Sequence, residues 1–97
     1  MNIKSKDEII RTIQVNQKLI QKYGVQKIGL FGSHARGEAT YSSDVDFLVD
    51  LDAKTFDNYM GLKIFLEELL NCKVDLVLPH TIRPALRDAI LKEVIYA

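Results

Sequence analysis

The chain has 97 residues, enough for one domain that spans residues 1–97. Its composition, 47% hydrophobic and 27% charged, is typical of a globular protein, and no apolar run approaches the ~20 residues of a membrane span. Thirteen basic residues balance thirteen acidic ones, which disfavours nucleic acid as a partner. The single Cys72 excludes an internal disulfide framework. Because the N-terminus lacks the apolar segment of a signal peptide, we expect a cytoplasmic protein without membrane contact.

Residues 5–24 predict the first helix. Ser5 and Glu8 stand in the register of a capping box, and Gly24 stands where a C-terminal cap belongs. Between them, apolar residues recur at helical spacing: Ile9, Ile10, Ile13, Leu19, Ile20 and Tyr23. This pattern predicts one continuous helix.

Two short strands are expected next, separated by a turn. Residues 25–31 are mostly apolar and end at Gly32, after which residues 33–37 can form one helical turn. Residues 38–43 predict a loop. The stretch 44–51 alternates, with every second residue apolar and on one face of a strand: Val45, Phe47, Val49 and Leu51.

The second half of the chain predicts two helices and one further strand. Residues 55–71 carry an apolar series at helical spacing: Phe56, Tyr59, Met60, Ile64, Phe65 and Leu69. Residues 73–79 predict a strand stopped by Pro79, and residues 83–93 predict a helix with Pro84 near its start. The last four residues suit either a short strand or a tail. The expected fold class is α/β (α+β), a small mixed sheet of three to four strands flanked by helices.

Three aspartates stand at the starts of strands. Asp44 and Asp46 project from the same face, with Cα atoms ~6.5 Å apart. Two like charges in a partly buried place need a counter-charge, and Mg²⁺ takes carboxylate oxygens as ligands. A solvated strand edge or a turn cap is the other interpretation of this pair. Asp75 adds a third carboxylate, since it is the only charged residue in the run 74–79.

A shared site would fix the topology. If the turn after the first strand meets the aspartates, the first two strands are antiparallel. The helix over 55–71 is then a crossover, which makes the third strand parallel to the second. All three carboxylates would meet at one end of the sheet.

The segment after the first strand suits a phosphate group. Gly32 lets the backbone turn sharply, Ser33 offers a hydroxyl and an N–H group, and Arg36 offers a planar fork that matches phosphate oxygens. Each residue alone is also common in surface turns. His34 could touch a phosphate, but a solvated turn histidine is the favoured interpretation.

The whole stretch "GSHARGEATYSSDVD", residues 32–46, resembles the signature of the DNA polymerase β-like nucleotidyltransferase superfamily. Within this stretch, the sequences Gly-Ser-x-Ala-Arg-Gly and Ser-Asp-x-Asp resemble those of the minimal nucleotidyltransferase (MNT) family. The resemblance continues through "KVDLV" to the ending "AILKEVIYA". Minimal nucleotidyltransferases of this size resemble the antitoxins of HEPN/MNT toxin–antitoxin pairs.

The resemblance implies a two-metal transfer of AMP from ATP, dependent on two Mg²⁺ ions. Asp44 and Asp46 would hold both ions. Asp75 would complete the shell of one ion and act as general base on the acceptor hydroxyl. Gly32, Ser33 and Arg36 would hold the β- and γ-phosphates.

The resemblance also implies a protein acceptor, a tyrosine hydroxyl of a cognate HEPN toxin, and so an adenylyltransferase that acts as an antitoxin. No second domain is visible to hold an acceptor, so we expect another chain, or a second copy of this one, to supply that surface. Two alternatives stay open: a nucleotide-binding antitoxin that neutralises its partner by docking alone, and an unrelated α/β domain whose carboxylates are solvated.

Overall fold

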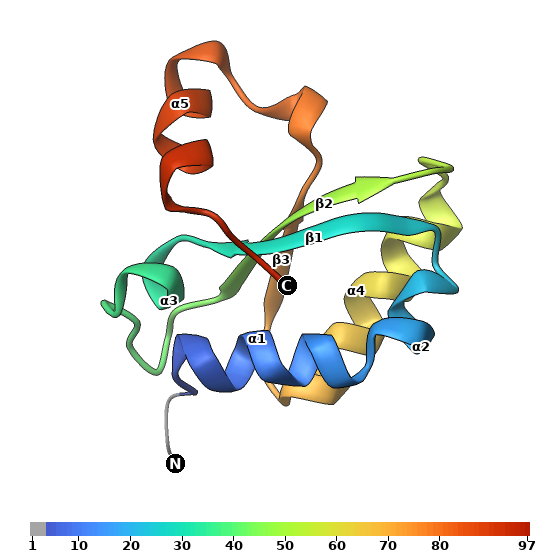
Figure 1. Cartoon of the computed structure of the whole chain (residues 1–97), viewed down its shortest axis with the longest axis horizontal. Helices are drawn as coiled ribbons and strands as arrows, with labels where there is room; N and C mark the ends of the chain where they lie inside the picture. The colour runs from blue at the N-terminus through green and yellow to red at the C-terminus, as the bar shows by residue number, and fades with distance from the viewer. Residues whose placement is uncertain (1–3) are drawn as a thin grey trace.

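A computed structural model describes residues 4–97 of the chain. The first three residues, which belong to the expected domain of residues 1–97 and to the segment considered for a signal peptide, lie outside the described residues. Four strands form one sheet in the order β3-β2-β1-β4. The helices α1, α2 and α4 lie on one side of this sheet, and α5 lies on the other (Figure 1).

The strand directions confirm the predicted topology. β1 (Val25–Phe31) and β2 (Val45–Leu51) are antiparallel, and β2 and β3 (Val74–Val77) are parallel. The last residues form a strand, β4 (Ile95–Tyr96), which pairs antiparallel with β1. The fold is therefore the expected small mixed sheet flanked by helices.

The first helical region differs from the prediction, because it is two helices rather than one. α1 (Lys6–Val15) begins at Ser5, whose hydroxyl accepts a hydrogen bond from the Glu8 N–H at 3.2 Å. α2 (Gln17–Gln21) follows after a break at Asn16. The Asn16 amide donates to the Thr12 carbonyl oxygen at 2.8 Å, and such side-chain bonds to the backbone compete with regular helix.

The long crossover helix α4 (Phe56–Leu70) follows the expected apolar series only in part. Tyr59, Phe65 and Leu69 of that series pack against the core, but none of them is fully buried. Leu62, Leu66 and Leu70 are its fully buried residues. Phe56 is 76% exposed and Ile64 is 50% exposed, although both belong to the predicted series. The helix is apolar on more than one side, so spacing alone did not identify the side that faces the sheet.

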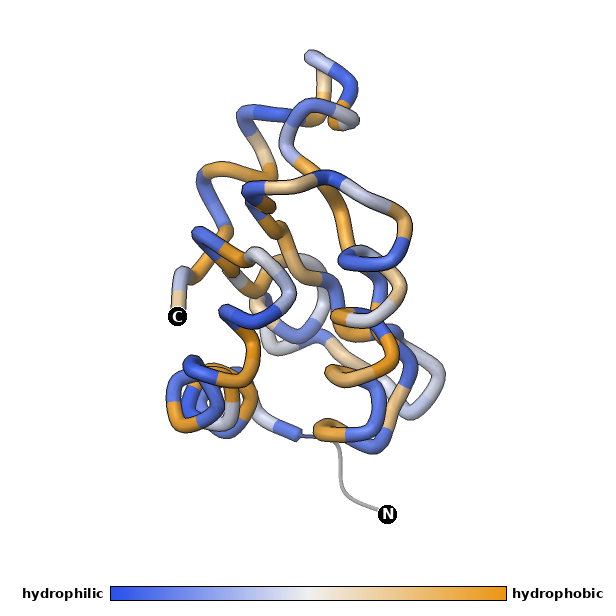
Figure 2. The backbone as a smooth tube through the Cα atoms, turned by 90° about the vertical axis from the view of Figure 1, so that its right-hand side faces the viewer, coloured by the Kyte–Doolittle hydropathy of each residue, from blue (hydrophilic) through white to orange (hydrophobic). Residues whose placement is uncertain are grey.

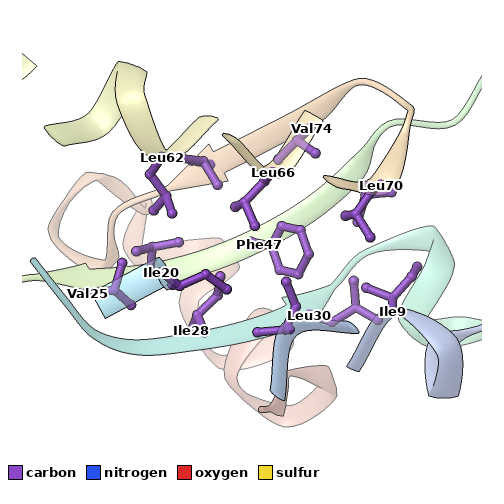
Figure 3. Packing of buried hydrophobic residues seen from close by; sticks show 14 of the residues in the cluster. Ile9, Ile20, Val25, Ile28, Leu30, Phe47, Leu62, Leu66, Leu70 and Val74 are labelled. Atoms are coloured by element: carbon purple, nitrogen blue, oxygen red, sulfur yellow. The ribbon is translucent and has the colours of Figure 1, made fainter. Parts of the chain in front are cut away.

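The main core lies between the sheet and the helices α1, α2 and α4. Phe47 sits at its centre, with Leu30, Leu66 and Ile9 around it (Figure 3). The four apolar residues of β2 predicted to share a face are all buried in this core. Figure 2 shows hydrophobic and hydrophilic residues alternating along much of the chain, as expected where elements have one buried and one exposed side.

The opposite face of the sheet carries a smaller cluster. Phe31, Leu48 and Ile82 are buried there, and Ile90 and Val94 pack against them. A short 3₁₀ turn, η1 (Pro79–Thr81), leads from β3 to α5 (Pro84–Glu93), which has no fully buried residue. Among residues 4–97 no helix is long and apolar enough to cross a membrane.

Candidate active site

The predicted phosphate-binding turn forms at the end of β1. Gly32 has φ 79° and ψ −156°, a backbone conformation essentially restricted to glycine. A Cβ atom at this position would lie 2.2 Å from Oδ2 of Asp46, so the absence of a side chain lets the turn approach that carboxylate. Residues Ser33–Arg36 then form the single helical turn α3, closed by Gly37 in the left-handed conformation. The turn is local in origin, because two glycines provide its entry and its exit.

The sheet brings the three aspartates to the same end as this turn. Phe31 is paired with Asp46 across β1 and β2, and Asp46 is paired with Asp75 across β2 and β3. Neighbouring strands lie ~4.8 Å apart, so the carboxylates of Asp46 and Asp75 project side by side. Asp44 directly precedes β2 and shares the side of Asp46. All three therefore stand on the sheet face that α5 partly covers.

Asp46 is the carboxylate most affected by this arrangement. Burial raises its pKa to about 6 from 3.8, with further contributions from the charges of Asp75 and Asp44. The nearby guanidinium of Arg36 acts in the opposite direction but does not cancel the effect. A site that raises a carboxyl pKa in this way favours a cation, because a positive charge offsets both the crowding and the loss of water.

The same carboxylates do not form a closed metal cage. Within residues 4–97, no three acidic, histidine or cysteine side chains lie close enough together to hold a metal ion. Asp44 and Asp75 are exposed, so their side chains can change rotamer. Oxygen donors of this kind suit Mg²⁺, which is usually held by one or two carboxylates together with substrate phosphates. The chemistry of the residues fits such an ion, and the metal roles of Asp44, Asp46 and Asp75 stay a prediction.

His34 differs from its favoured interpretation as a solvated residue. It is 6% exposed, and burial lowers the pKa of its imidazole. Its Nδ1 atom has no hydrogen-bond partner within the described residues. The residue was misjudged because α3 packs against β1 and β2, and His34 comes to lie beside the start of α1, only in the folded chain.

Glu93 was missed by sequence analysis altogether. It is the last residue of α5, yet its carboxylate accepts a hydrogen bond from the Gly32 N–H at 3.0 Å. The same carboxylate contacts Nη1 of Arg36 at 3.0 and 3.2 Å. A glutamate in a charged, exposed helix carries no local signal of such a contact, so only the tertiary structure reveals it.

The mixed sheet, the glycine–serine turn at the end of its first strand and the acidic pair that begins the next define a nucleotidyltransferase domain. Residues 12–97 match the profile of the nucleotidyltransferase domain family, and the chain belongs to that family.

Individual relatives agree with this assignment. A protein from Thermococcus cleftensis named protein adenylyltransferase MntA is 38% identical over 92 residues, which cover 93% of each chain. A solved structure described as a minimal nucleotidyltransferase superposes with a TM-score of 0.82 at 32% identity, covering 98% of both chains. The structure of a toxin–antitoxin complex with AMP-PNP shares the fold, with a TM-score of 0.67 at 22% identity over 86% of this chain and 70% of that chain.

Proposed function

We propose that this chain transfers AMP from ATP to a hydroxyl group of a partner protein, and that it acts in this way as an antitoxin. The placement of Asp44, Asp46 and Asp75 beside the turn at Gly32 and Ser33 carries the proposal. The relative from T. cleftensis, a protein adenylyltransferase by name, supports the same activity, because its similarity extends over 93% of both chains.

Each residue of the site has a role that follows from its position. The Gly32–Ser33 turn and Arg36 bind the β- and γ-phosphates, which leaves the α-phosphate beside the aspartates. Asp44 and Asp46 would hold two Mg²⁺ ions, and Asp75 would contribute to one of them. Ions bound there would supply positive charge that stabilises the attacking and the leaving oxygens.

The transfer itself is a displacement at phosphorus. The acceptor oxygen forms a bond to the α-phosphorus, and the bond from the α-phosphorus to the oxygen that bridges to the β-phosphate breaks. Pyrophosphate leaves, and Asp75 accepts the proton of the acceptor hydroxyl. A tyrosine of a helical toxin of the HEPN class is the acceptor we infer from the family.

Label transfer from ATP tests the proposal. The chain is incubated with a co-purified protein encoded beside it, in the presence of Mg²⁺ and ATP labelled at the α-phosphate. We expect the label to appear on the partner protein. Asp44→Asn combined with Asp46→Asn should abolish the label and leave the circular dichroism spectrum unchanged. Asp88→Asn is the matched control, since Asp88 is exposed on α5.

The outcomes separate the candidate functions. Label transfer that persists in the double variant would exclude the catalytic assignment. Nucleotide binding and neutralisation of the toxin without any label would favour an antitoxin that acts by docking. Absence of Mg²⁺-dependent ATP binding would exclude both functions.

A further inference from the structure

The C-terminal end of α5 contacts the phosphate-binding turn through one side chain. The carboxylate of Glu93 accepts hydrogen bonds from the backbone N–H of Gly32 and from Nη1 of Arg36. The side chain of Glu93 is 25% exposed and that of Arg36 is 47% exposed, so the glutamate is the more enclosed partner. Two groups assigned to phosphate binding are thus connected to a helix from the other end of the chain.

Residues before and after Glu93 in the chain hold its backbone against the sheet. Ile90 and Val94 pack against the small cluster on this face of the sheet. Val94 can seat closely because it lies over Gly29, where an added Cβ would come within 2.5 Å of the valine Cγ2. The carboxylate therefore extends from an anchored position.

Arg36 is bracketed by two carboxylates. Its Nε donates to Glu38 at 2.7 Å, and its Nη1 donates to both oxygens of Glu93. A guanidinium has five N–H donors, and no hydrogen bond from Nη2 is present within residues 4–97. The Nη2 edge therefore keeps its donors for a ligand, while the other two nitrogens fix the plane of the group.

We propose that Glu93 is a positioning residue for the triphosphate, holding Arg36 and the backbone at Gly32 in the geometry that binds it. This inference rests on the proposed nucleotidyltransferase function. A free arginine loses much rotamer freedom when it binds a ligand, and an arginine already held loses less. Because Glu93 acts on the groups assigned to the β- and γ-phosphates, its effect is confined to nucleotides that carry them.

If Glu93 instead competed with the triphosphate, its replacement would have the opposite effect on binding. Glu93 would act as an internal anion if its carboxylate occupied the place of a phosphate, and its removal would then tighten triphosphate binding. Among the described residues 4–97, Nη2 of Arg36 and the hydroxyl of Ser33 make no hydrogen bond, so both keep donors that Glu93 does not engage. These unused donors favour positioning over competition.

Isothermal titration calorimetry with two ligands tests the role. The ligands are a non-hydrolysable ATP analogue with Mg²⁺, and AMP with Mg²⁺. Glu93→Gln should weaken binding of the ATP analogue about fivefold, the size expected for a partly exposed ion pair, and leave AMP binding unchanged. Asp88→Asn, on the same helix, should change neither. Unfolding curves of each variant verify that the domain is folded.

A double-mutant cycle shows whether Glu93 acts through Arg36. Arg36→Ala should weaken binding of the ATP analogue. Adding Glu93→Gln to it should cost less than Glu93→Gln costs in the parent chain, because only the contact of Glu93 with the Gly32 N–H then remains to be lost. A loss as large in the Arg36→Ala background as in the parent chain, an equal loss for AMP, or unchanged or tighter binding of the ATP analogue by Glu93→Gln would overturn the inference alone. No Mg²⁺-dependent binding of the ATP analogue by the parent chain would overturn the proposed function, and this inference with it.

Discussion

Replacing Asp46 by asparagine should stabilise the metal-free protein above pH 6, although it should also abolish nucleotidyl transfer. Asp46 lies between Asp75 on one side and the turn at Gly32 on the other. Burial, together with neighbouring carboxylates, raises its pKa to about 6 from 3.8. Asparagine has nearly the same shape and no charge, so it removes the electrostatic cost and keeps the packing.

The sign of the effect follows from proton binding. A carboxyl whose pKa is higher in the folded state binds its proton more tightly there than in the unfolded chain. Its favourable contribution is complete below pH ~4 and is lost as the pH rises through about 6. Above that range the ionised carboxylate makes folding less favourable than a neutral side chain would.

The size of the effect can be worked from the shift. A rise from 3.8 to about 6 corresponds to about 3 kcal/mol at 1.36 kcal/mol per unit. Asp46 is partly exposed, so water and salt reduce this to ~1–2 kcal/mol. For a domain of this length, that is a rise of roughly 5–10 °C in Tm.

Chemical unfolding in urea, measured from pH 4 to pH 8 with EDTA present, tests this calculation. The variant Asp46→Asn should have the higher free energy of unfolding at pH 8, and the difference should vanish near pH 4. Asp88→Asn, an exposed aspartate on α5, should show no such pH-dependent gain. A variant no more stable than the parent at pH 8, or equally more stable at both pH values, would refute the reasoning.

Two further pairs of substitutions, each a test and its control, examine the turn and the core. Gly32→Ala should lower the free energy of unfolding by at least ~2 kcal/mol in urea titration, because it combines a glycine-only conformation with a clash against Asp46. Gly37→Ala, whose Cβ would meet nothing within 4 Å, should cost only ~1 kcal/mol, and equal losses would show that the clash is absent. Phe47→Ala, at the centre of the core (Figure 3), should lower the free energy of unfolding by ~3–5 kcal/mol. Phe56→Ala, at a side chain that is 76% exposed, should leave Tm unchanged. Similar losses of stability at both sites would contradict the assigned core.

Much of the candidate site could be predicted from the sequence because its parts are local. The break after β1 and the exit at Gly37 follow from glycine. The shared side of Asp44 and Asp46 follows from the two-residue period of a strand. The strand directions were also predicted, but only by assuming that the turn and the aspartates share a site. The roles assigned to these residues in binding nucleotide and metal stay predictions.

Contacts between distant segments could not be predicted in this way. His34 was expected in solvent and is buried, since the turn that carries it packs against the sheet. Glu93 was not singled out, since its partners lie at the other end of the chain.

The sequence by itself determined where most helices, strands and turns begin and end, because caps, glycines and residue periodicity act over a few neighbouring residues. The break at Asn16, the 3₁₀ turn η1 and the choice of a strand for the last residues were not determined in this way. Only the tertiary structure decided which side of α4 is buried, since Leu62, Leu66 and Leu70 face the core and Phe56 does not. It also decided that the end of α5 meets the turn after β1. The physical reason is that burial and pairing depend on what covers an element, and that surface comes from residues far away along the chain.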